Sequence, residues 1–162
     1  MMRLTKKLEA EIKKMMTTYW DSYMQGDLKT WASFLPNDYR NIGTNKEEYW
    51  NSKKEIVDYT KKVFKTAVGK ADLRKKKIQV IPYDPYFMVH EFGDLYVRAD
   101  EGWVFYAPCR LSSLLEKTTQ GWKILHQHGS YPDSKTEDGE AFGFNELKTE
   151  NKKLRDAIER RT

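Results

Sequence analysis

The sequence lacks most of the features that mark a secreted or membrane-bound protein. Its 162 residues include one cysteine, Cys109, so no disulfide can form within the chain. No apolar run approaches the length of a membrane-spanning helix, and the charged, amphipathic N-terminus has no hydrophobic segment typical of a signal peptide. We therefore expect a cytoplasmic protein that makes no contact with a membrane.

A large excess of one charge is also missing. The chain has 29 Lys and Arg against 24 Asp and Glu, which gives a net charge of +5. A nucleic-acid-binding domain usually concentrates its basic residues more strongly. The densest basic run, residues 74–77, is expected to be the solvated start of a strand. The prediction is that nucleic acid is not a partner.

Sequence signatures of catalysis and metal binding are absent too. There is no glycine-rich phosphate loop, no His-Glu-x-x-His motif and no pair of cysteines. His126 and His128 could share a metal, but His90 is not an obvious third ligand. We expect the lone Cys109 to be a small apolar filler and not a nucleophile. The sequence therefore assigns no catalytic residue, metal or cofactor.

What the chain does contain is a pattern of helices followed by strands. Aromatic residues make up 14% of the sequence, enough for a core in a domain of this length. Apolar spacing predicts helices over residues 4–24, 28–35 and 53–67. From residue 76 the period changes to two and predicts five strands, with one of the turns at Gly93-Asp94. This order predicts the α+β class.

The last predicted strand, residues 121–130, carries two of the three histidines. Read with a period of two, one face holds Trp122, Ile124, His126, His128 and Ser130. A tight turn before Gly121 places Glu116 opposite Lys123, a favourable pair of opposite charges. The same register puts Trp103, Phe105 and Leu111 of the preceding strand on the face with the histidines.

A face that is apolar at one end and polar at the other, covered by helices, is typical of a pocket. The alternative is that both histidines are hydrogen-bonded groups in the core or at its rim. For the pocket we expect a small apolar or aromatic ligand. The predicted lining residues are Trp31, Tyr39, Trp50, Trp103, Phe105, Leu111, Trp122, His126, His128 and Ser130.

Two stretches carry a resemblance to a known family. RLSSLLEKTTQGWKILHQHGSYPD resembles the last hairpin of SnoaL-like domains in the NTF2-like superfamily, where an Arg precedes Gly-Trp-Lys and a His-x-His-x-Ser ending. FLPNDYRNIGTNKEEYW resembles the early part of these domains. The resemblance covers residues 4–132. It implies a cone-shaped barrel in which a curved antiparallel sheet wraps around N-terminal helices and leaves a cavity at the open end.

The resemblance does not imply one reaction, because the superfamily includes isomerases, dehydratases, cyclases, transport adaptors and non-catalytic ligand binders. Its enzymes usually place an Asp-His pair or a lone carboxylate in the cavity. In this chain Asp38, Glu47 and Glu48 lie in the corresponding half, and we expect them to be cap and surface charges.

The C-terminal segment has the spacing of a coiled coil. Phe144, Asn151 and Ile158 take position a, and Leu147 and Leu154 take position d. An Asn at a central a position is typical of a parallel two-stranded register. The alternative is an amphipathic helix that packs back on its own domain.

This helix reaches Thr162 without a cap, and we therefore expect an output domain to follow. A SnoaL-like domain followed by such a helix is similar to the input ends of bacterial histidine kinases and nucleotide cyclases. We divide the chain into a SnoaL-like domain (1–133), a linker (134–141) and a signalling helix (142–162).

The first hypothesis for function is a non-catalytic sensory domain that binds a small molecule and forms a homodimer. Dimer contacts are expected on the outer face of the sheet and along the tail, through Leu147, Asn151, Leu154 and Ile158. The second hypothesis is a small SnoaL-like enzyme of the isomerase, dehydratase or hydrolase type with His128 as acid or base. The third is a structural dimerisation module with a filled core.

Overall fold

The computed structural model describes residues 3–160 and, for residue 75, the backbone alone. The chain forms two units, Met1–Tyr131 and Pro132–Thr162, and each is described by itself. In chain order the elements are α1 (Lys6–Gln25), α2 (Leu28–Ser33), β1 (Arg40–Ile42), β2 (Tyr49–Trp50), α3 (Lys53–Ala67), β3 (Ala71–Tyr83), β4 (Tyr86–Ala99), β5 (Gly102–Thr118), β6 (Gly121–Ser130) and α4 (Phe144–Glu159).

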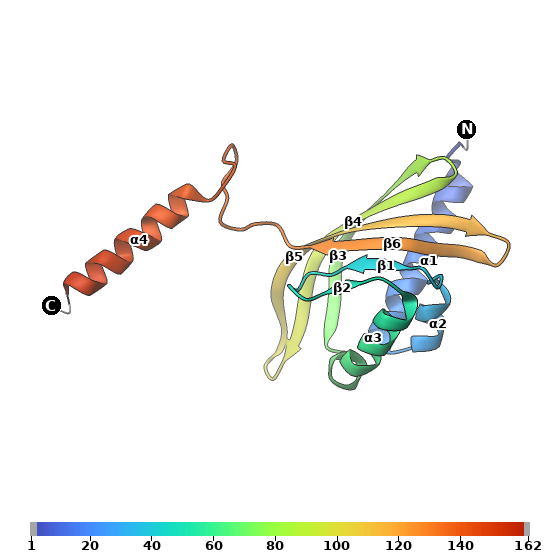
Figure 1. Cartoon of the computed structure of the whole chain (residues 1–162), viewed down its shortest axis with the longest axis horizontal. Helices are drawn as coiled ribbons and strands as arrows, with labels where there is room; N and C mark the ends of the chain where they lie inside the picture. The colour runs from blue at the N-terminus through green and yellow to red at the C-terminus, as the bar shows by residue number, and fades with distance from the viewer. Residues whose placement is uncertain (1–2, 161–162) are drawn as a thin grey trace. The chain divides into compact units, whose positions relative to one another are not determined.

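The first unit is an α+β structure built on one curved sheet (Figure 1). Its six strands are ordered β2-β1-β6-β5-β4-β3. Neighbouring strands are antiparallel, except that β1 runs parallel to β6. The two short strands therefore extend the edge of the sheet beside β6, where the connection from α2 to α3 passes. Within residues 3–160, no helix combines the length and apolar character that a membrane crossing requires.

The helices of this unit begin and end within two residues of the predicted bounds. The Thr5 hydroxyl caps α1 by accepting from the backbone N–H of Leu8 at 3.2 Å, and Gly26 ends the helix with a φ of 79°. The Ser52 hydroxyl caps α3 in the same way through the N–H of Glu55. These caps fix the helix ends and therefore set which side chains turn toward the sheet.

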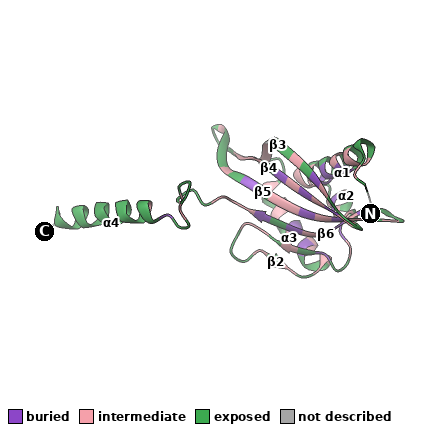
Figure 2. Ribbon diagram, turned by 90° about the horizontal axis from the view of Figure 1, so that it is seen from above, coloured by how far each residue is buried: buried purple, intermediate pink, exposed green. Residues whose placement is uncertain are grey.

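The core lies between α1, α2 and the inner face of the sheet. Its fully buried side chains come from α1, from the segment around α2 and from the three central strands (Figure 2). Burying aromatic and aliphatic groups of this size contributes about 1.5–3 kcal/mol each. The aromatic and aliphatic core side chains with less than 2% exposure are Ile12, Met16, Tyr19, Trp31, Leu35, Tyr39, Phe87, Val89, Leu115 and Ile124.

One predicted turn is wrong. β4 continues through Gly93-Asp94, so the two strands predicted on either side of this pair are one. A side chain at Gly93 would place its Cβ 2.7 Å from the carbonyl oxygen of Arg74 on β3. The pairing of β3 with β4 also shifts at Arg74 to Lys77. Gly93 therefore marks a close approach of two strands at a bulge and not a turn.

The hairpin of β5 and β6 begins in the predicted register and then leaves it. Glu116 faces Lys123 and Leu115 faces Ile124, as expected. The next pair is Leu114 with His126, so Leu125 is an extra residue in β6. A bulge of one residue moves every following side chain to the opposite face of the sheet.

A second bulge lies where β5 pairs with β4. Leu95 faces Ala107, but Tyr96 faces Phe105, so Tyr106 is the extra residue in β5. The side chains of β5 before this bulge, such as Trp103 and Phe105, therefore lie on the face opposite to the one that a regular strand would give them. Together the two bulges invert the predicted orientation at both ends of the hairpin and leave only its central part as predicted.

Candidate ligand-binding cavity

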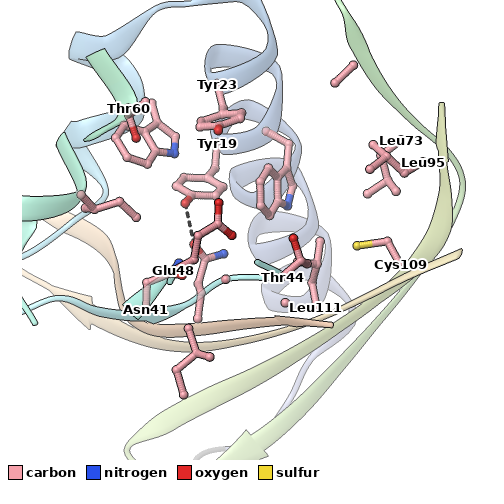
Figure 3. A pocket seen from close by; sticks show the side chains of 18 of the residues that line it. Tyr19, Tyr23, Asn41, Thr44, Glu48, Thr60, Leu73, Leu95, Cys109 and Leu111 are labelled. Carbon is pink, nitrogen blue, oxygen red and sulfur yellow. Dashed lines mark hydrogen bonds between the residues drawn. The ribbon is translucent and has the colours of Figure 1, made fainter. Parts of the chain in front are cut away.

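The first unit contains a partly open cavity of about 270 Å³ between its helices and the inner face of the sheet. Figure 3 shows Tyr19, Tyr23 and Thr60 on its helical side and Leu73, Leu95 and Cys109 on its sheet side. An apolar cavity of about 150 Å³ is enough to bind benzene. The space is therefore sufficient for an aromatic ring with a short substituent.

Aromatic rings make up the helical wall of the cavity. Helix α1 contributes three of them because positions 19, 20 and 23 lie on one side of the helix. The rings of Tyr19 and Trp20 contact edge to face with 4.8 Å between their centroids, and those of Trp50 and Tyr59 contact at a tilt of 46° with 4.7 Å between their centroids. The lining aromatic residues are Tyr19, Trp20, Tyr23, Trp31, Trp50, Tyr59 and Tyr131.

 The sheet side of the cavity is mainly aliphatic. It is formed by Ala71, Leu73, Leu95 and Leu111, together with the thiol of Cys109. The four aliphatic side chains come from β3, β4 and β5, at positions that share the inner face of the sheet. Burial raises the pKa of the Cys109 thiol, so the thiol stays protonated and is a weak nucleophile at neutral pH. Cys109 is therefore placed as the apolar filler that the sequence predicts.

A hydrogen-bond network closes the floor of the cavity around Gln127. The side-chain oxygen of Gln127 accepts from the hydroxyl of Tyr39 at 2.8 Å and from the hydroxyl of Tyr19. Its amide nitrogen donates to the hydroxyl of Ser113 at 2.9 Å. The amide of Asn41 donates to the hydroxyl of Tyr39 at 2.7 Å and also lines the cavity. Because burial raises the pKa of Tyr19 and Tyr39 well above 10, both phenols remain neutral donors.

Glu48 is the acidic side chain of the cavity wall. One carboxylate oxygen accepts from the hydroxyl of Tyr59 at 2.9 Å and from the side chain of Asn45 at 3.1 Å, and the other accepts from the backbone N–H of Asn45 at 3.1 Å. A Cβ at Gly43 would lie 2.2 Å from this carboxylate. Because residue 43 is a glycine, the Glu48 carboxylate can occupy the space that a side chain at this position would fill.

A second carboxyl group lies behind the wall. Glu91 is 1% exposed, and its Oε2 accepts from the indole N–H of Trp20 at 2.8 Å. Burial raises the pKa of Glu91, and its other oxygen, Oε1, has no hydrogen-bond partner. Trp20 lines the cavity, so Glu91 fixes the orientation of one ring of the wall.

Three predicted pocket residues line the cavity: Trp31, Trp50 and Leu111. Tyr39 is buried below it, in the Gln127 network. Trp122 lies in the core away from the cavity, with its ring 5.7 Å from that of Phe87, and it donates to Glu11. The sequence therefore identified part of the aromatic wall.

The predicted placement of His126, His128 and Ser130 in the pocket is wrong. The bulge at Leu125 turns them to the outer face, and the inner face at this end carries Gln127, Gly129 and Tyr131 instead. His128 is exposed and cannot reach the contents of the cavity, so the proposed acid or base role of His128 there is wrong as well. Burial lowers the pKa of the half-buried His126.

Trp103 and Phe105 are also misplaced by the prediction. The bulge at Tyr106 turns them to the outer face, where both are exposed. The ring of Phe105 contacts that of Tyr96 with a centroid distance of 5.7 Å, and the guanidinium of Arg74 lies 5.5 Å from the ring of Trp103. Both residues therefore belong to an aromatic surface and not to the cavity.

Four residues of the cavity and its floor were not predicted from the sequence: Gln127, Asn41, Glu48 and Tyr131. Gln127 lies between the two histidines in the sequence, and only the bulge at Leu125 brings it to the inner face. Glu48 was expected at the surface, although the glycine at position 43 is a signal for a close approach. Among the residues that the structure describes, no group of three or more His, Cys, Asp or Glu side chains could hold a metal ion.

Comparisons with known proteins agree with this architecture. The SnoaL-like domain family matches residues 12–134. An NTF2-like protein of unknown function from Pseudomonas putida KT2440 superimposes with a TM-score of 0.69 at 12% identity, covering 82% of this chain and 92% of that one. An NTF2-like protein with a cystatin-like fold from Novosphingobium aromaticivorans gives a TM-score of 0.63 at 11% identity, with coverages of 82% and 84%.

A proposed dehydratase of the NTF2-like family from Streptomyces avermitilis gives a TM-score of 0.63 at 14% identity, covering 80% of this chain and all of that one. At such identities the similarity shows the fold and not the activity. No curated protein matches the chain at a significant level. The family match and the shared architecture lead to one conclusion: the chain belongs to the SnoaL-like domain family and has the fold of NTF2-like proteins.

Proposed function

We propose that the first unit binds a small, mainly apolar molecule in its cavity without chemical turnover, as a sensory domain of a bacterial signalling protein. The size of the cavity and its aromatic wall support binding. The buried polar groups at its floor are largely paired with one another through Gln127, so they shape the site and are not poised to react. A cavity of about 270 Å³ is also unlike the filled core of a structural dimerisation module.

The observation that carries the sensory proposal is the position of Tyr131. This residue lines the cavity, and it is also the last residue of the first unit. The second unit begins at Pro132 and leads to α4. A ligand that moves Tyr131 would therefore act directly on the segment that leaves the domain, which is the coupling that a sensor needs.

The tail supports the same proposal. No residue of α4 is buried, and its apolar a and d side chains are exposed (Figure 2). We propose that Leu147, Asn151, Leu154 and Ile158 pair with a second copy of the chain, ahead of an output domain beyond Thr162, which lies outside the described residues. A second contact is proposed on the outer face of the sheet, where Phe92, Trp103 and Phe105 are exposed.

The binding proposal is tested by filling the cavity. Ala71 lines the cavity from β3, whereas Gln79 is an exposed residue of the same strand. Ala71→Phe should abolish the thermal stabilisation that wild-type protein gains from small aromatic compounds, and Gln79→Phe should preserve it. Binding that persists unchanged in Ala71→Phe, with a normal melting transition, would place the ligand outside the cavity and contradict the proposal.

A further inference from the structure

Glu48 is the only ionisable acid or base, tyrosine and cysteine aside, among the residues that line the cavity. Among the side chains that the structure describes, no Lys, Arg or His is part of the lining. A ligand with a carboxylate or phosphate group would therefore meet a negative charge and no positive one. A ligand with a positive charge would meet a carboxylate that has no cationic partner in the wall.

The carboxylate is held in place and not free to swing into solvent. It accepts three hydrogen bonds, from Tyr59 and from two groups of Asn45, and it occupies the space that Gly43 leaves open. Figure 3 shows Glu48 extending into the cavity below Tyr19 and Tyr23. A charge fixed in this way needs little reorganisation when a ligand arrives.

Aromatic rings surround the same end of the cavity. Tyr23 comes from α1, Tyr59 from α3 and Tyr131 from the end of the sheet. Burial raises the pKa of all three, and the charge of Glu48 raises each of them further. The carboxylate therefore acts on phenols from three separate elements. Aromatic rings beside a carboxylate are surroundings that favour an organic cation over a neutral group.

We infer that the cavity selects a small organic cation: a protonated amine or quaternary ammonium group on an apolar body. The cationic group would lie beside Glu48, and the apolar body would contact the rings and Leu95, Leu111 and Ala71. This inference rests on the proposed function, because it names the class of ligand for the same cavity.

Three probes of similar size test the inference: 2-phenylethylamine, which is a cation at pH 7, 2-phenylethanol, which is neutral, and phenylacetate, which is an anion. Isothermal titration of the whole chain should show the amine binding about tenfold more tightly than the alcohol, with phenylacetate weakest. Glu48→Gln should lower the affinity for the amine to that for the alcohol and leave the alcohol unchanged.

Glu47→Gln is the matched control, because Glu47 is an exposed neighbour outside the lining and its change alters the net charge equally. Equal losses in the two variants, or an alcohol that binds wild type as tightly as the amine, would overturn the selection of a cation. Binding of the alcohol that Ala71→Phe abolishes would still uphold the proposed function. If none of the probes binds, the proposed function and this inference fail together.

Discussion

Glu91 shows at the scale of one residue how the fold keeps a carboxyl group away from water. It lies on the inner face of β4, is 1% exposed and has one oxygen bonded to Trp20 and the other without a partner. A buried carboxylate with an unpaired oxygen is costly, so the protonated form is favoured in the folded state. This agrees with the direction in which burial moves the pKa of Glu91.

The consequence is a dependence of stability on pH with a defined sign. The pKa of Glu91 is raised in the folded state, so the folded chain holds a proton that the unfolded chain releases near pH 4.3. Between the two pKa values, the free energy of unfolding falls as the pH rises. Above both values, the stabilisation that protonated Glu91 gives to the folded state is fully lost.

Urea denaturation between pH 4 and pH 8 measures the free energy of unfolding at each pH. This free energy should change with pH at different slopes in wild type and Glu91→Gln. The advantage of wild type over the variant should be greatest at the lowest pH and should decrease as the pH rises, because glutamine does not titrate. Glu101→Gln, in the exposed turn between β4 and β5, should follow the wild type. Parallel curves for wild type and Glu91→Gln would show that Glu91 has the same pKa in the folded and unfolded states, and would contradict the raised pKa of the buried carboxyl group.

At the scale of elements, the sequence predicts local features such as helix caps and turns. It does not predict features that depend on the pairing of two strands, such as bulges. Helix caps such as Thr5 and Ser52 depend on residues three positions apart, and the turn after Thr118 fixes the first pairs of the last hairpin. These features could be predicted. A bulge depends on how two strands curve around the helices, and the alternation of the sequence through Leu125 does not show it.

The cavity lining follows from the same distinction. Trp31 and Trp50 could be placed because they lie on predicted helix and loop segments that cover the sheet. Most strand residues could not, because the extra residue Leu125 brings Gln127 to the inner face in place of the histidines. The extra residue Tyr106 likewise moves Trp103 and Phe105 to the outer face. The resemblance to SnoaL-like domains predicted that a cavity exists, and the register of the bulges decided its chemistry.

The bulge at Leu125 leads to a prediction by deletion. Removing Leu125 would make β6 regular while leaving Ile124 and Gln127 on the inner face, since the extra residue is the one that is lost. This variant should fold and retain the Gln127 network, at a cost of about 1–3 kcal/mol in the free energy of unfolding. Deleting Lys123 instead should prevent folding, because it turns the buried Trp122 to the outer face. Urea denaturation compares the two, and equal stability of the deletion variants would contradict the assigned bulge.

At the scale of the whole molecule, the proposed sensor requires that the tail report on the domain. Helix α4 has 16 residues, and isolated helices of this length are marginally stable in water. Two such helices would not hold a dimer by themselves, so the proposed contact between the sheets must supply most of the affinity. The tail would then indicate the geometry of the pair, which a ligand at Tyr131 could change.

The tail pairing is tested at Asn151 and position 154. In a Cys109→Ala background, Leu154→Cys should form a disulfide between two chains under mild oxidation, because equivalent d positions face each other in a parallel pair. Asn151→Leu should keep the dimer but allow other registers and larger oligomers, since the polar a position no longer disfavours them. Light scattering measures the mass, and cross-linking at position 154 measures the register. A monomeric wild type, or a dimer whose tails never cross-link at this position, would remove the basis for signalling through the helix and leave the cavity as a binding site alone.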